Sequence, residues 1–242
     1  MQRLFPDSTP VGEDVYDDLG FAALAPEDRP YTVVNMVATV DGQARVGANT
    51  CALGNAIDLK LFAALRGQVD CVLAGTSTVA AEHYGALART PERRQLRVER
   101  GLRPRPWFAT VTRSGSLPLD QPLFQDPDSD VIVFSPVKPD IAGIPAHVVH
   151  ETTVEAGEIG RILRQQYGVS TLLIEGGPSI DQLFFAAGVV DQLFLTVAPV
   201  LTGGSPPFPI VAGSLAQSCD LALVGALLDE DHLFLRYSVV TA

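Results

Sequence analysis

The strongest chemical signal in the sequence is the segment at residues 172–179, which reads Leu-Leu-Ile-Glu-Gly-Gly-Pro-Ser. A short apolar strand here runs into a turn in which Gly176 and Gly177 leave room for a ligand close to the backbone. Pro178 suits the first turn of a helix, and the free N–H groups at a helix start attract phosphate. The segment indicates a phosphate-binding turn, although strand-to-helix turns also use glycine for shape alone.

A second strand-to-helix turn has the same character. Residues 71–74 are apolar, and Gly75, Thr76, Ser77 and Thr78 follow them, which adds three hydroxyl groups at another helix start. Ligands of parallel sheets bind beyond the carboxyl ends of the strands. We therefore expect both turns to face one cleft.

Arg113 and Ser114 come directly after a third apolar strand at residues 108–112. An arginine beside a hydroxyl group suits the 2′-phosphate that distinguishes NADP from NAD. Taken alone, Arg113 is better explained as a surface turn residue, so this assignment depends on the two glycine turns.

Several other kinds of site are excluded by the sequence. It contains no Gly-x-Gly-x-x-Gly, Walker A, Gly-x-Ser-x-Gly or His-Glu-x-x-His motif, so hydrolases lack their nucleophile or metal. Its three cysteines lie far apart and form no Cys-x-x-Cys. His147 and His150 lie in a strand-like stretch, where residues three apart point to opposite faces. We predict no metal site.

An alternation of strands and helices must position these residues. The pattern predicts strands at 31–40, 71–74, 108–112, 130–135, 146–150, 171–174 and 191–200, helices at 58–65, 91–100, 155–167 and 178–187, and a final hairpin at 221–227 and 232–240. This alternation indicates an α/β fold with a mainly parallel sheet and a C-terminal antiparallel hairpin. Residues 31–242 then form one domain. Residues 1–30 form an acidic arm packed on it, in which Thr9-Pro10 opens a short helix.

The composition supports a globular protein and argues against two kinds of partner. Among 242 residues, 47% are hydrophobic and 19% are charged, which provides a large core. A net charge of −11 argues against nucleic acid. The longest apolar runs reach about half of the ~20 residues that a membrane span needs. Residues 1–10 contain no hydrophobic stretch, so we expect no signal peptide and a cytoplasmic location.

Seven arginines are concentrated between residues 89 and 105. We interpret this stretch as a solvated helix face with Glu92 and Glu99 as charge partners.

Several blocks in order carry a family resemblance: Asn-Met-Val-Ala-Thr-Val-Asp-Gly at 35–42, Asp58 to Leu65-Arg66, residues 70–78 with Glu-His-Tyr-Gly at 82–85, Glu-Gly-Gly-Pro at 175–178, Val-Val-Asp at 189–191, and Ala-Pro at 198–199 with Gly-Gly at 203–204. From Tyr31 to Tyr237 the chain resembles the reductase domain of riboflavin biosynthesis, above all its stand-alone pyrimidine reductases. The resemblance implies a dihydrofolate-reductase-like three-layer sandwich, NADPH as cofactor and a homodimer. It also implies reduction of the phosphorylated pyrimidine 5-amino-6-(5-phosphoribosylamino)uracil by hydride transfer to ribose C1.

The resemblance also assigns residues to the site by position. The cofactor positions, including those suggested by the three turns, are Ala38, Gly75, Thr76, Thr78, Arg113, Ser114, Gly176, Gly177, Pro178, Ser179 and Ile180. The substrate positions are Asn35, Thr50, Arg66, Glu82 and Glu175, with Arg66 against the 5-phosphate. Glu175, Glu82 or bulk water supplies the proton. The chain departs from many relatives at two positions of the substrate pocket. They have an aromatic residue near Ala52 and an aspartate where this chain has Glu82.

Two other functions stay open at this point. One is a related reductase that acts on dihydrofolate, another pterin or another small heterocycle. The other is a nucleotide-binding protein without turnover. Many relatives also carry a zinc deaminase domain with a Pro-Cys-x-x-Cys signature, and because the sequence lacks its cysteines we expect no deaminase activity.

Overall fold

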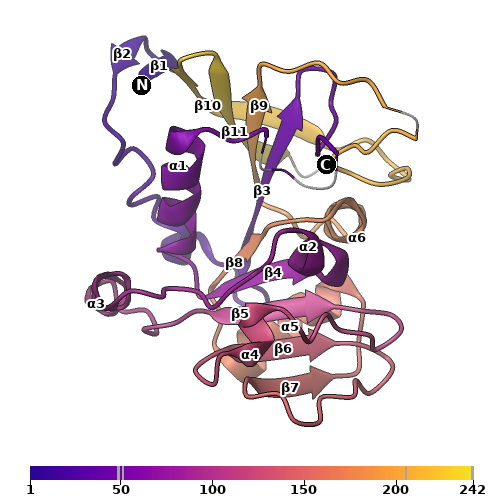
Figure 1. Ribbon diagram of the computed structural model, residues 1–242. Coiled ribbons are helices and arrows are strands. Elements are labelled where there is room, and N and C mark those ends of the chain that lie inside the picture. Colours follow the sequence, from indigo (N-terminus) through magenta and orange to yellow (C-terminus); the bar gives the residue numbers. More distant parts are fainter. Residues whose placement is uncertain (48–49, 51, 205, 241–242) are drawn as a thin grey trace.

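The computed structural model describes residues 1–47, 50, 52–204 and 206–240, and it is built around one sheet with helices on both faces (Figure 1). The strands are β1 (Gln2–Phe5), β2 (Thr9–Pro10), β3 (Tyr31–Thr39), β4 (Cys71–Gly75), β5 (Trp107–Val111), β6 (Asp130–Phe134), β7 (His147–Glu151), β8 (Thr171–Ile174), β9 (Gln192–Ala198), β10 (Asp220–Asp229) and β11 (His232–Val240). The helices are η1 (Phe21–Leu24), α1 (Ala56–Arg66), α2 (Thr76–Ala81), α3 (Pro91–Glu99), α4 (Pro122–Gln125), α5 (Ala156–Tyr167) and α6 (Pro178–Ala186).

The strand order explains where a ligand can bind. It runs β2-β1-β10-β11-β9-β3-β8-β4-β5-β6-β7. The seven strands from β9 to β7 pair in parallel, whereas β11, β10, β1 and β2 continue the sheet in antiparallel fashion. This arrangement confirms the predicted α/β class with a mainly parallel sheet and a C-terminal hairpin. The carboxyl ends of the central strands β3, β8 and β4 lie side by side.

The core lies in two layers, one on each face of the sheet. On one face, α1 packs through Leu61 and Leu65 against strand residues such as Val33 and Leu173. On the other face, α5 and α6 bury their apolar residues against β3 and β8. The helix α1 begins earlier than predicted, at Ala56, because the Asn55 side chain accepts a hydrogen bond from the Asp58 N–H and caps the helix.

The N-terminal segment corrects one prediction. Thr9 and Pro10 do not open a helix but form β2, which pairs with Arg3 and Gln2 of β1. Proline is tolerated there because β2 is the outermost strand, where no further strand needs a hydrogen bond from the N–H group that proline lacks. The strand β1 pairs with β10, so this segment extends the sheet (Figure 1). Farther along, Tyr16 and Phe21 are buried in the core.

No helix within the described residues has the length and apolar character needed to cross a membrane.

Candidate functional site

A cavity of about 1750 Å³ lies at the carboxyl ends of β3, β4 and β8. Its walls come from α1, α2, the start of α6 and the segment at residues 207–213. Both glycine turns expected from the sequence line this one cavity. A cavity at this edge is where parallel sheets bind ligands.

Close contact between the two glycine turns shapes the cavity floor. The Gly75 N–H donates to the Gly176 carbonyl at 2.9 Å. A β-carbon on Gly177 would lie 2.8 Å from Thr78 Oγ1, and one on Gly75 would lie 3.0 Å from Ile180 Cγ1. A β-carbon at either position would therefore displace a side chain of the opposite turn.

The helix α6 starts at this floor. Gly177 is its N-cap residue, no side chain caps it, and Pro178 occupies the first turn. The Pro178 carbonyl accepts a hydrogen bond from the Ala212 N–H at 3.0 Å, which ties the segment at 207–213 to the helix start. The positive end of the helix dipole thus faces the cavity, with Ser179 and Ile180 in its lining.

An ion pair with a buried carboxylate and a partly exposed arginine forms another wall. Arg66 donates from Nε and Nη2 to the two carboxylate oxygens of Glu175, at 2.6 and 2.5 Å. The Tyr84 hydroxyl donates to the same carboxylate, and the Arg66 guanidinium lies over the Phe62 ring at 4.1 Å. Burial and then the Glu175 carboxylate raise the pKa of Tyr84 well above its ordinary value, so its proton stays in place. Burial alone would lower the pKa of Arg66, but the Glu175 carboxylate outweighs it and raises that pKa.

Most of the sequence-predicted site residues come together here. The cavity is lined by Asn35, Thr50, Arg66, Gly75, Thr76, Thr78, Glu82, Glu175, Gly177, Pro178, Ser179 and Ile180. Glu82 accepts a hydrogen bond from the Thr50 N–H at 2.9 Å, which connects the two residues.

Four predicted residues lie outside the described lining: Ala38, Gly176, Arg113 and Ser114. Ala38 is buried in β3, and Gly176 lies beneath the turn. Arg113 and Ser114 are exposed in the turn after β5, two and three residues beyond Val111, which does line the cavity.

The arginine-rich stretch corrects a second prediction, because it is not simply a solvated helix face. The Arg97 side chain is buried and donates to the carbonyls of Arg66 and Arg103. In the described residues the ion pairs of this stretch are with Asp126, Asp128 and Asp130, not with Glu92 or Glu99. The sequence predicted neither arrangement because both depend on contacts with distant elements.

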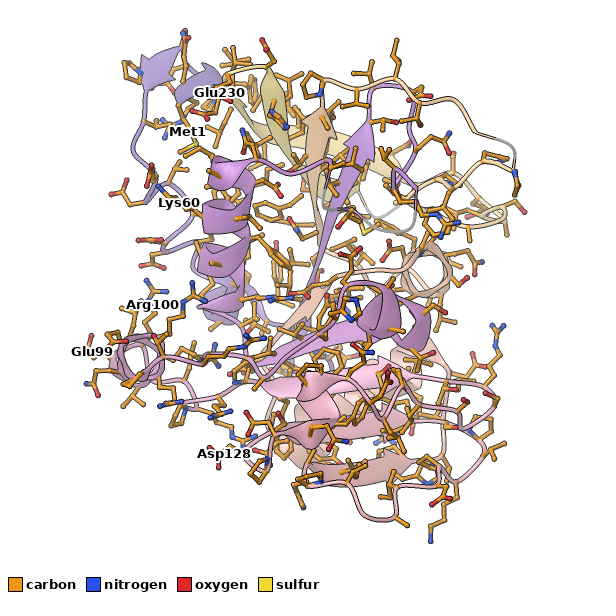
Figure 2. All side chains as sticks on the ribbon, viewed as in Figure 1. Met1, Lys60, Glu99, Arg100, Asp128 and Glu230 are labelled. Carbon is orange, nitrogen blue, oxygen red and sulfur yellow. The ribbon has the colours of Figure 1, made fainter. Side chains whose placement is uncertain are left out.

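Several cavity residues were not assigned from the sequence. Arg89, Arg93 and Arg100 line the cavity near α3 and form no ion pair in the described part of the chain. Figure 2 shows Arg100 beside α3, at the side of the molecule where α1 also lies. The sequence shows that arginines are clustered here, but it does not show that three of their side chains line a cavity.

The described residues contain no group of three or more His, Cys, Asp or Glu side chains placed to hold a metal. His147 and His150 lie in β7, as expected for a strand, with His147 near Asp130 and His150 near the Ser135 carbonyl.

The fold and the site define an α/β protein with a ligand cavity at the carboxyl ends of its parallel strands, built on paired glycine turns. Residues 30–231 match the model of the RibD C-terminal domain, and the chain belongs to this family.

Two relatives carry the name 2,5-diamino-6-ribosylamino-4(3H)-pyrimidinone 5′-phosphate reductase. The protein from Archaeoglobus fulgidus is 25% identical over 182 residues, covering 73% of this chain and 83% of the relative. The protein from Methanothermobacter thermautotrophicus is 24% identical over 225 residues, covering 87% and 99%. The structure of a pyrimidine reductase-like protein from Corynebacterium diphtheriae is similar in fold, with a TM-score of 0.79 and 21% identity over 95% of this chain and 99% of that one.

Proposed function

We propose that this protein reduces a 5-phosphoribosylamino pyrimidine with NADPH, the kind of reaction for which its relatives are named. The observation that carries this proposal is the single cavity in which two glycine turns face the Arg66–Glu175 pair. The glycine turns suit the phosphates of a dinucleotide, and the charged pair suits a polar heterocycle with its sugar.

The cofactor half of the proposal depends on the floor of the cavity. The turn at Gly75 and Thr78 and the uncapped start of α6 at Gly177 offer hydroxyl and N–H donors to a pyrophosphate. Arg113 and Ser114, exposed beyond the end of β5, are available to a 2′-phosphate of a cofactor that extends past the rim. When bound, the reduced nicotinamide supplies the hydride. The protein supplies orientation and shields the reacting atoms from water.

The substrate half uses the wall opposite α6. Because Glu175 already neutralises much of the Arg66 charge, Arg66 by itself is a weak anchor for the 5-phosphate. Arg89, Arg93 and Arg100 line the same cavity without carboxylate partners in the described residues, and we assign the phosphate to this side together with Arg66. Asn35 and the remaining acceptor capacity of Glu175 then face the pyrimidine and ribose.

Both carboxyl oxygens of Glu175 accept hydrogen bonds from Arg66 and Tyr84, so we assign it the role of a hydrogen-bond acceptor and not of the proton donor. Glu82 lines the cavity beside Thr50 and is the carboxyl that remains as proton source, with water as the alternative. The pH profile of the Glu82→Gln variant distinguishes the two. A proton donor acts only while it is protonated, so a fall in activity with rising pH that is present in the wild type and absent in the variant assigns the proton to Glu82.

The test of the proposed function is NADPH oxidation by the full chain with three substrates compared directly. They are the 2,5-diamino-pyrimidinone 5′-phosphate named for the relatives, its deaminated uracil counterpart expected from the sequence, and dihydrofolate. We expect turnover with one or both phosphorylated pyrimidines. Turnover with dihydrofolate alone would make this a pterin reductase, and NADPH binding with no turnover on any of them would make it a non-catalytic nucleotide-binding protein.

A further inference from the structure

Asp181 is a buried carboxyl in the first turn of α6 that the proposed reaction does not use. Its side chain is 0% exposed, and neither oxygen has a hydrogen-bond partner among the described residues. A buried polar group without a partner is costly, so such a group calls for an explanation.

The carboxyl lies directly behind the cavity floor. A β-carbon built on Gly176 would lie 3.7 Å from Asp181 Oδ2 and 2.9 Å from the Met36 sulfur, so these two side chains flank the same glycine. Met36 lines the cavity, as do Gly177 and Ile180 on either side of the turn. Asp181 therefore lies next to the cavity lining without being part of it, and the Met36 side chain beside it is unbranched and adaptable.

The position of Met36 indicates which end of the cavity this is. Asn35 and Met36 are consecutive in β3 and point to opposite faces of the sheet. Met36 shares its face with Ile180 of α6, whereas Arg66 and Glu175 face Tyr84 on the other. Asn35 and Met36 both line the cavity, so the proposed cofactor wall and the proposed substrate wall adjoin at this point of β3. A hydride can pass between two ligands only where these walls meet, so the nicotinamide end of a cofactor belongs there.

The charged residue nearest to Asp181 in this turn is Glu175, directly before Gly176, and its carboxyl is engaged by Arg66 and Tyr84. The segment at 207–213 has no charged residue, β9 has none, and Arg45 lies over the Phe208 ring. On α5, Arg161 pairs with Glu158, and Arg164 donates to Ser170. Burial is the one cause that raises the pKa of Asp181 well above its ordinary value, which favours the neutral carboxyl in the free protein.

We propose that Asp181 is an electrostatic partner of the oxidised nicotinamide ring: the carboxyl releases its proton to solvent when a positively charged ring binds in front of Met36. The inference rests on the proposed function, because it requires a nicotinamide cofactor. A carboxylate facing a positive ring is stabilised in a site of low dielectric, whereas the neutral ring of the reduced cofactor gives no such stabilisation. Asp181 then favours NADP⁺ over NADPH increasingly as the pH rises.

The test is calorimetric titration of the full chain with NADP⁺ and, separately, with NADPH. Each titration is done at one pH in two buffers of different ionisation enthalpy, which gives the number of protons exchanged on binding. We expect net proton release with NADP⁺ and none with NADPH. The affinity for NADP⁺ rises with pH, and the affinity for NADPH does not.

The Asp181→Asn variant keeps the shape of a neutral carboxyl but cannot ionise. We expect it to release no proton with either cofactor and to bind NADP⁺ about tenfold more weakly at the upper end of the pH range, with NADPH affinity unchanged. Asp28→Asn, at an exposed carboxyl far along the chain, is the matched control and keeps the wild-type pattern.

Equal proton exchange with NADP⁺ and NADPH in the wild type, or proton release that persists in Asp181→Asn, would overturn the inference. The wild-type comparison does not depend on any variant folding. If neither cofactor binds, the proposed function fails instead, so the two failures are distinguishable.

Discussion

The guanidinium of Arg66, at the end of α1, holds the carboxylate of Glu175, one residue beyond the end of β8, through two hydrogen bonds across 109 residues of sequence. The pair joins a helix from one face of the sheet to the central strand edge where the cavity opens. The Tyr84 hydroxyl is a third donor, so three hydrogen bonds fix the position of this carboxylate at the cavity.

The two halves of this ion pair should differ in their importance to stability. The Glu175 side chain is 2% exposed and that of Arg66 is 30% exposed. Arg66→Ala leaves a buried carboxylate without its cation, and we expect it to cost about 3 kcal/mol of the free energy of unfolding. Glu175→Gln costs less, because the arginine is rehydrated. Urea unfolding measures both, and Arg3→Ala, at an exposed ion pair, is the control with a change below about 0.5 kcal/mol. The opposite order of the two site variants would contradict this reading.

Gly177→Ala should weaken cofactor binding while a matched glycine variant leaves it intact. The added methyl group meets Thr78 Oγ1 at 2.8 Å, so the Thr78 hydroxyl must turn away from the floor of the cavity. At Gly157 in α5 nothing lies within 4 Å of the added carbon, so Gly157→Ala fills open space and stabilises the helix by about 0.5–1 kcal/mol. NADPH binding by fluorescence, with melting temperatures of both variants, checks the prediction. Unchanged affinity in a folded Gly177→Ala would remove this turn from the cofactor site.

Preference for NADPH over NADH tests the assignment of Arg113 and Ser114. Ser114 Oγ accepts a hydrogen bond from the Ser116 N–H at 3.2 Å, which shapes the turn that presents Arg113. A charge-assisted contact to the 2′-phosphate contributes about 1.5–3 kcal/mol, or roughly 10- to 150-fold in affinity. We expect Arg113→Ala to lose most of this preference at low salt, and Arg3→Ala to keep it. Equal dissociation constants of the wild type for both cofactors would reject the assignment.

The free energy of unfolding should depend on pH through the ionisation of Asp181. Because burial raises the pKa of this carboxyl above its unfolded value, the folded state binds more protons than the unfolded state between the two pKa values. The free energy of unfolding therefore falls as the pH rises through that interval, by about 1.4 kcal/mol per pH unit. Relative to wild type, Asp181→Asn gains stability from the ordinary carboxyl pKa upward, and Asp28→Asn does not. Parallel pH profiles of wild type and Asp181→Asn would show that the carboxyl is solvated.

The edge of β10 is the surface on which we expect a homodimer. The strand β1 pairs with β10 through Ala226, Leu227 and Leu228, and among the described residues no strand pairs with 220–224 on that side. Leu221, Leu223 and Val224 in this stretch are 37–40% exposed. A second copy covers such an edge well. Sedimentation should give twice the 25.8 kDa chain mass, with Leu223→Lys shifting it to monomer and Val137→Lys, at another exposed apolar position, leaving it unchanged. A wild-type monomer at micromolar concentration would refute the dimer.

The sequence by itself determined the strand–helix alternation and the two glycine turns. These features follow from local rules: short continuous apolar runs between turn residues form buried strands, and a turn with a positive φ favours glycine. The final hairpin was predictable for the same reason, since its two strands are adjacent in the chain. A local rule failed at Thr9-Pro10, where pairing with β1 prevailed over the capping pattern.

Only the tertiary structure decided which charges meet. The Arg66–Glu175 pair, the arginines of α3 at the cavity and the complete burial of Asp181 each depend on elements brought together from distant parts of the chain. The sequence gives the type of each charged side chain, but packing decides its partner and its exposure to water. Partner and exposure in turn determine the pKa and the interactions of the charge.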